Sequence, residues 1–196
     1  MVRKAIVSRK TKETQIKVIL NLDGSGKVDI STGIPFFDHM LTAFAVHGFF
    51  DLCIKAKGDL EVDNHHTIED IGLVLGQALF KALGDKKQIA RFGDFCVPMD
   101  EALSRVIIDL SNRPFLVFNF PDKLNHYKNF DIFIVKEFFY AFCVQGAFNL
   151  HVNTYYGANE HHVLESIFKA LGKSLHIATR TNENIKTVLS SKGSLK

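Results

Sequence analysis

A chain of 196 residues is long enough for one domain or two small ones and too short to hold a second full-sized catalytic domain. Hydrophobic residues make up 46% and charged residues 23% of the chain, which argues against intrinsic disorder and fibrous repeats for most of its length. The formal net charge is +3 and the basic residues are scattered, so nucleic acid is not expected as the main partner.

The three cysteines are widely spaced and include no Cys-x-x-Cys pair, which argues against a disulfide framework and against a thiolate zinc site. A reducing, cytoplasmic location is therefore expected. No apolar run approaches the length of about 18 residues that a membrane helix needs, and no apolar segment follows the basic N-terminus. Neither membrane association nor secretion is expected.

The sequence contains an internal duplication. Residues 65–79 (HHTIEDIGLVLGQAL) recur as residues 161–175 (HHVLESIFKALGKSL), with His-His, Glu, Ile, Leu, Gly and Leu in the same places. Two more pairs of segments align without gaps: 39–56 with 137–154, and 13–22 with 101–110. We therefore divide the chain into two similar halves, 1–91 and 92–179, and a tail, 180–196, within one compact domain.

Each half is predicted to form the unit β-β-α-β-α. The first half should contain strand 13–22, a further strand, helix 35–47, strand 50–57 and helix 65–83. Its copy should contain strand 101–110, a further strand, helix 132–145, strand 148–155 and helix 161–177. Paired strands followed by helices predict an α+β fold in which helices cover one face of a mixed sheet. The polar tail has no such periodicity, and its composition predicts poor order.

Both copies of the long helix begin with the pattern His-His-x-x-Glu. Residues i and i+4 of a helix lie about 40° apart around its axis, whereas residue i+1 points well to the side. His65 and Glu69 can therefore bind one metal ion while His66 faces another. The duplication suggests an exchange of ligands, with one site made of His65, Glu69 and His162 and the other of His161, Glu165 and His66.

Each of these sites lacks a ligand if six-coordination is required, and His39 and His151 are the best remaining candidates. The duplication aligns these two with Glu137 and Cys53, so the additional ligands are not inherited symmetrically. Imidazole and carboxylate ligands without thiolate suit manganese, zinc or ferrous iron, and octahedral coordination favours manganese. The pattern His-Glu-x-x-His is absent, which argues against a zinc protease. The isolated histidines receive no role: His47, His126 and His176.

Candidate phosphate ligands lie outside the repeated motifs. Arg91 and Arg113 offer guanidinium groups, and the tail segment Ser190-Ser191-Lys192 offers hydroxyls, backbone N–H groups and an ammonium. Glu13 and Asp100 stand at the starts of the two duplicated strands and are candidate acid or base groups, although such carboxylates are usually only solvated.

Five segments together resemble the imidazoleglycerol-phosphate dehydratase family of histidine biosynthesis. They are GIPFFDHML at 33–41, DNHHTIED at 63–70, RFGDF at 91–95, MDEAL at 99–103 and NEHHVLES at 159–166. The resemblance spans nearly the whole chain and corresponds to the monofunctional form, without a fused histidinol-phosphatase. It implies a duplicated fold like domain 2 of ribosomal protein S5, two manganese ions per active site, and a cubic homo-oligomer of twenty-four subunits with active sites between subunits.

The resemblance also assigns roles to residues. It implies that eight side chains bind metal: His39, His65, His66, Glu69, His151, His161, His162 and Glu165. It implies that six contact the phosphorylated imidazole substrate: Glu13, Arg91, Arg113, Ser190, Ser191 and Lys192.

The implied reaction converts D-erythro-imidazoleglycerol phosphate into imidazoleacetol phosphate. If both ring nitrogens bind manganese, the imidazole becomes an imidazolate, which can expel the neighbouring hydroxyl. Glu13 is expected to move the C–H proton as the enol forms and becomes the ketone. Two rival functions remain: a dinuclear metallohydrolase, which would need a metal-bound water as nucleophile, and a non-enzymatic metal-binding shell protein, which would need no phosphate ligands.

Overall fold

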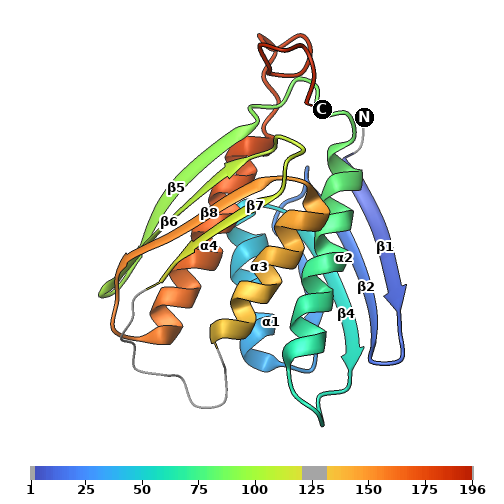
Figure 1. The fold of residues 1–196 in the computed structure, drawn as a ribbon, viewed down its shortest axis with the longest axis vertical. Helices are drawn as coiled ribbons and strands as arrows, with labels where there is room; N and C mark the ends of the chain where they lie inside the picture. Colours follow the sequence, from blue (N-terminus) through green and yellow to red (C-terminus); the bar gives the residue numbers. More distant parts are fainter. Residues whose placement is uncertain (1–2, 121–131, 196) are drawn as a thin grey trace.

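The computed structural model describes residues 3–120 and 132–195 (Figure 1). The first half of the chain forms four strands and two helices. In chain order these are β1 (Lys4–Lys10), β2 (Thr14–Asn21), β3 (Val28–Ser31), α1 (Pro35–Gly48), β4 (Asp51–Gly58) and α2 (His65–Leu83).

The second half repeats this order. Its elements are β5 (Phe92–Met99), β6 (Ala102–Asp109), β7 (Phe115–Asn119), α3 (Ile132–Gly146), β8 (Asn149–Tyr156) and α4 (Glu160–Thr179). The α+β class and the duplicated units expected from the sequence are confirmed, and each unit has one additional strand at its start.

The additional strands, β1 and β5, lie at one edge of each sheet. In β1 the buried residues Ala5 and Val7 alternate with exposed residues, but one of these is the apolar Ile6, so the sequence shows no clear alternation of apolar and polar residues. In β5 the sequence signal is hidden by Gly93 and Pro98, which normally predict a turn. The edge position tolerates the proline, and a Cβ on Gly93 would overlap with the backbone of Ser174 in α4.

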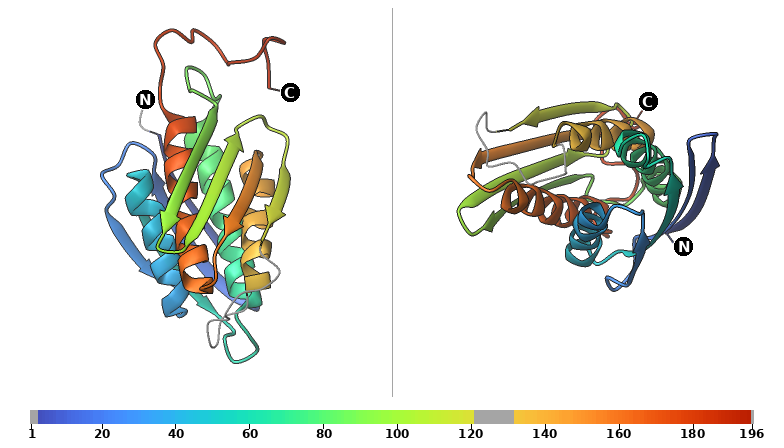
Figure 2. Two further views of the ribbon diagram at one scale, coloured as in Figure 1. Left: turned by 90° about the vertical axis from the view of Figure 1, so that its left-hand side faces the viewer. Right: turned by 90° about the horizontal axis from the view of Figure 1, so that it is seen from below.

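Each half forms its own four-stranded sheet, and the two sheets share one topology. The strand orders are β1-β2-β4-β3 and β5-β6-β8-β7. In each sheet the last pair, β3 with β4 or β7 with β8, is parallel and the other pairs are antiparallel, so both sheets are mixed. The helices lie between the sheets (Figure 2), with α2 on β1 and β2, and α4 on β5 and β6.

The two halves are joined by helix pairs that cross between them, α1 with α4 and α2 with α3. Glycines of the duplicated Leu-Gly pair make both contacts close. A Cβ on Gly76 of α2 would lie 2.6 Å from the carbonyl oxygen of Phe142, and one on Gly172 of α4 would overlap with that of Phe44. The repeated glycine is therefore explained by direct contact between helix backbones.

All four helices run in the same direction (Figure 1). Their first turns lie at the end of the molecule away from both chain termini, which we call the helix-start end, together with the β1–β2 turn, the β4–α2 connection and the β5–β6 turn. The α2–β5 connection, the β6–β7 turn and the C-terminal tail lie at the opposite end, which we call the termini end. The histidine motifs therefore share one end of the molecule.

Candidate metal centre

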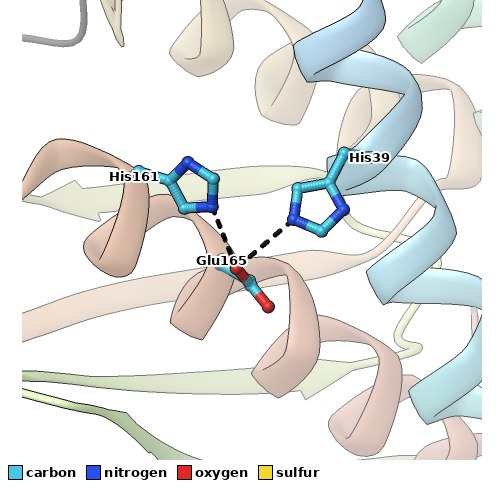
Figure 3. A group of neighbouring side chains, drawn as sticks. All are labelled: His39, His161 and Glu165. Atoms are coloured by element: carbon cyan, nitrogen blue, oxygen red, sulfur yellow. Dashed lines mark hydrogen bonds and ion pairs between the residues drawn. The ribbon is translucent and has the colours of Figure 1, made fainter.

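Three of the predicted ligands come together at the helix-start end (Figure 3). His39 comes from the second turn of α1, and His161 and Glu165 come from the first two turns of α4. The Oε2 atom of Glu165 lies 3.3 Å from Nε2 of His39 and 3.1 Å from Nε2 of His161. All three ligand atoms lie within 4.8 Å of one another. The tight packing of α1 on α4 thus joins ligands from the two halves of the chain.

The electrostatics of this group suit a cation. Burial opposes ionisation of Glu165, but the hydrogen bond from Lys169 and the charges of Lys169 and His39 outweigh it and lower the pKa of the carboxyl to about 2. Lys169 Nζ contacts Oε1 at 2.8 Å, which leaves Oε2 facing the two imidazoles. An ionised carboxylate oxygen and two imidazole nitrogens form a donor set that suits manganese, zinc or ferrous iron.

The first histidine motif opens α2 in the same way. Nε2 of His65 lies 3.4 Å from Oε2 of Glu69, and both side chains are partly exposed. His66 points elsewhere, and its Nδ1–H donates to Oδ2 of Asp59 at 3.0 Å. That hydrogen bond, with the nearby charges of Glu13 and Asp59, raises the pKa of His66 above its usual value.

The second histidine of the motif that opens α4, His162, makes an analogous contact. His162 Nδ1–H donates to Oε2 of Glu101 at 2.7 Å, while its Nε2 lies 3.6 Å from Oδ2 of the exposed Asp100. The hydrogen bond from His162, followed by that from the backbone of Asn159, lowers the pKa of Glu101 to about 2.

His151 lies on β8 between the buried residues Leu150 and Val152, so its side chain faces away from the helices. Within the residues that the structure describes, His39, His161 and Glu165 are the one group of three or more metal-ligating side chains. Five of the predicted ligands are not part of it: His65, His66, Glu69, His151 and His162. Their role in metal binding stays a prediction.

Glu13 is exposed in the β1–β2 turn at the helix-start end. The backbone N–H of Glu13 donates to the hydroxyl of Thr11 at 3.1 Å. The turn borders a cavity of 300 Å³ that Asp59 also lines. Asp70 of α2 accepts hydrogen bonds from Arg9 and Thr14 and so ties both sides of this turn to the helix that carries His65.

The predicted phosphate ligands lie at the termini end. Arg91 donates to both carboxylate oxygens of Asp109, at 2.7 and 3.0 Å, and to the carbonyl oxygen of Leu189 in the tail at 2.6 Å. The tail is also fixed by the backbone N–H of Gln88, which donates to the carbonyl oxygen of Thr187 at 3.0 Å. Arg113 is exposed in the β6–β7 turn, and Ser190, Ser191 and Lys192 follow Leu189 in the tail.

The two sets of predicted site residues are therefore far apart within one chain. Helix α2 has 19 residues and extends from His65 at the helix-start end to the connection that carries Arg91. At about 1.5 Å per residue, that helix alone separates the two ends by about 28 Å.

Sequence reasoning missed four residues around these groups: Asp59, Asp70, Glu101 and Lys169. The duplication offered a signal for Glu101, which aligns with Glu13, and Lys169 stands four residues after Glu165 on the same helix face. Among the histidines without a role, His47 contacts the carbonyl oxygen of Ala43 at 2.9 Å and His176 packs on Phe49. His126 lies outside the described residues.

The duplicated α+β fold thus carries, at the starts of its helices, an imidazole and carboxylate group whose donor atoms suit a metal ion bound through nitrogen and oxygen. Comparison with known proteins then gives the family. A sequence model of imidazoleglycerol-phosphate dehydratase matches residues 32–175. The imidazoleglycerol-phosphate dehydratase of Acetivibrio thermocellus is 55% identical over 195 residues, which is 100% of both chains. That of Caldanaerobacter subterraneus is 56% identical and covers 98% of this chain and 100% of its own.

Solved structures give the same result. The crystal structure of the Staphylococcus aureus dehydratase has a TM-score of 0.81 at 37% identity and covers 93% of this chain and 100% of its own. That of Pyrococcus furiosus, in complex with (S)-C348, has a TM-score of 0.84 at 37% identity and covers 96% and 99%. The chain belongs to the imidazoleglycerol-phosphate dehydratase family, and it is a hydro-lyase of histidine biosynthesis that acts on a small molecule. None of its described helices is long and apolar enough to cross a membrane.

Proposed function

We propose that this hydro-lyase is manganese-dependent and converts D-erythro-imidazoleglycerol phosphate into imidazoleacetol phosphate with two Mn2+ ions per active site. The group of His39, His161 and Glu165 is the observation that carries this proposal, because its donor atoms already lie close enough to share one ion. His65 and Glu69 present the same imidazole and carboxylate pair at the start of the other long helix, as a second ion requires.

Bound Mn2+ would supply a positive charge that draws electrons from the substrate's imidazole ring. The chain's own groups provide the remaining chemistry. Glu13 is exposed on a turn that is fixed from both sides, so its carboxylate can take the C–H proton of a substrate held beside His66. Arg91, Arg113 and the tail segment Ser190–Lys192 would hold the phosphate and so fix the position of the reacting carbons.

We further propose that each active site is assembled from different subunits of a homo-oligomer of twenty-four chains. Two groups about 28 Å apart, the length of α2, cannot contact one small substrate. Packing the termini end of one subunit against the helix-start end of another would bring the phosphate ligands to the metal ligands. It would also let His66, His162 and His151 complete sites on neighbouring chains. A cytoplasmic location is inferred from Cys53, Cys96 and Cys143, all of which are free thiols.

The proposal is tested by assaying ketone formation from imidazoleglycerol phosphate with metal-free protein and after adding Mn2+. Full activity without metal would contradict manganese dependence, and release of inorganic phosphate instead of ketone would indicate a hydrolase. Analytical ultracentrifugation of the same samples tests the assembly. If ligands come from different subunits, metal binding and association are linked, so chelation should give smaller particles that re-form with Mn2+. A large particle that is demonstrably metal-free would contradict this placement.

A further inference from the structure

The second histidine of each motif is held from outside its helix by a carboxylate. We propose that Asp59 and Glu101 are positioning residues that orient His66 and His162 for metal binding through Nε2. This inference rests on the metal requirement of the proposed function, and it concerns how the chain prepares two of its ligands.

The two contacts share one geometry. Oδ2 of Asp59 accepts from Nδ1 of His66 at 3.0 Å, and Oε2 of Glu101 accepts from Nδ1 of His162 at 2.7 Å. The first histidines of the motifs behave differently, because His65 and His161 each turn Nε2 toward the glutamate one helical turn later. The external carboxylates therefore serve the histidines that have no partner of this kind on their own helix.

A neutral imidazole carries one N–H, and only the other nitrogen has a lone pair for a metal ion. A carboxylate is an acceptor, so it selects the tautomer with hydrogen on Nδ1 and leaves the lone pair on Nε2. It also stops rotation of the ring. Ligand histidines in metalloproteins commonly have such a partner, and its loss typically weakens metal binding about 10- to 100-fold.

The two carboxylates are themselves placed for this task. Oε1 of Glu101 accepts from the backbone N–H groups of Asn159 at 2.8 Å and Ala158 at 3.2 Å, which anchors it to the loop just before α4. Oδ1 of Asp59 is buried and has no hydrogen-bond partner among the described residues. A carboxylate with one oxygen buried and unpaired costs stability, so its position beside His66 points to a function for the other oxygen.

The duplication indicates how the two halves came to differ. Glu101 aligns with Glu13 at the start of the repeated segment and both are exposed, yet it is Glu101 that accepts from the second histidine of its own half, His162. In the first half Asp59, from the β4–α2 connection, holds His66 instead. This division of roles leaves Glu13 available for proton transfer.

Two isosteric substitutions test the inference. In Glu101→Gln the amide oxygen can still accept from the loop backbone, but the NH2 group would donate to Nδ1 of His162 and select the tautomer whose Nε2 is protonated. Asp59→Asn makes the same reversal at His66, and the Asp59 side chain accepts no backbone hydrogen bond from the described residues that the change could disturb. Each variant should bind Mn2+ about 10- to 100-fold more weakly than the wild type in calorimetric titrations of metal-free protein. Glu101→Asp keeps a carboxylate and should recover part of the loss.

Glu61→Gln is the matched control, because it removes one exposed negative charge from the same connection as Asp59. It should bind Mn2+ within about twofold of the wild type, since the charge of an exposed carboxylate is largely screened by water and salt. Circular dichroism of each metal-free variant checks that the fold is retained. The inference is wrong if Glu101→Gln and Asp59→Asn bind Mn2+ as tightly as the wild type does. It is also wrong if Glu61→Gln weakens binding as much as these two variants do. In either case the wild type binds Mn2+ and the proposed function stands. If the wild type itself binds no Mn2+, the metal requirement and this inference both fail.

Discussion

The closeness of α1 and α4 should set the geometry of the metal group, and Gly172→Ala tests this directly. Gly172 lies in the middle of α4, where its backbone touches α1 at Phe44 and Gly48. Alanine at a helical position favours the helix by about 1 kcal/mol over glycine, so on local grounds the change should stabilise the protein. The packing predicts the opposite result.

The added Cβ would fall about 1 Å short of normal van der Waals distance from the carbonyl oxygen of Phe44. Relieving such overpacking costs about 1–3 kcal/mol, which leaves a net loss of about 0–2 kcal/mol after the gain in helix propensity. His39 is on the same helix, five residues before Phe44. A shift of α1 by about 1 Å is several times the tolerance of about 0.2 Å for metal–ligand distances, so Mn2+ affinity should fall at least about 10-fold.

Gly76→Ala is the matched control for this prediction. Gly76 of α2 is the duplicate of Gly172, and its added Cβ would lie 2.6 Å from the carbonyl oxygen of Phe142 on α3, so the change strains the contact of α2 with α3 and leaves the contact of α1 with α4 unaltered. Urea unfolding should show similar losses for the two variants, whereas in calorimetry only Gly172→Ala should weaken the Mn2+ that His39, His161 and Glu165 bind. Equal Mn2+ affinities in two equally destabilised variants would refute the claim that this helix contact sets the site.

Three further predictions concern the turn, the tail and a buried lysine. Asp70→Asn should lower kcat by about 10- to 100-fold with unchanged Mn2+ affinity, because it releases the turn that carries Glu13; equal loss of metal binding would contradict this. Removing residues 190–196 should raise KM and leave the metal content intact. Lys192→Ala should reproduce about 1–3 kcal/mol of that loss in substrate binding. If the truncated enzyme keeps the kinetics of the wild type, phosphate recognition rests on Arg91 and Arg113. Burial lowers the pKa of Lys86 to about 8 from 10.5, so the unfolded chain binds more protons between these values and folded-state stability should rise with pH there. Lys86→Met should therefore unfold at a higher urea concentration than the wild type at pH 7, and this advantage should shrink toward pH 10. A difference in urea midpoint that does not change with pH would show that Lys86 does not titrate in this range.

The sequence was most informative where local pattern and duplication agreed. The expected helix 65–83 has the same bounds as α2, and the i, i+4 spacing correctly placed Glu165 beside His161. These features depend on helical periodicity, which is encoded within a few turns of the chain. The edge strands β1 and β5 were missed because an exposed isoleucine in β1 and a glycine and a proline in β5 obscure their alternation.

The contact of His39 with Glu165 lay beyond sequence patterns. These residues are 126 positions apart and belong to different halves, and the duplication aligns His39 with Glu137, which gives no hint of a partner. What joins them is the packing of α1 on α4, which depends on the glycines at both helix surfaces. Periodicity shows which side of a helix is apolar, but it does not choose the helix that will cover it.

The arrangement of the duplicated unit also suggests why the proposed active site needs an assembly. Because all four helices start at one end, duplication of a His-His-x-x-Glu helix start places both motifs at that end. The same parallel arrangement sends Arg91 and the tail, which follow the ends of α2 and α4, to the opposite end. Arg91 immediately precedes β5 and donates to Asp109, so it stays about 28 Å, the length of α2, from the helix-start end while the core is intact. Under the proposed function, the duplicated motif therefore adds predicted metal ligands within a subunit, and Arg91 would reach their substrate from a neighbouring subunit.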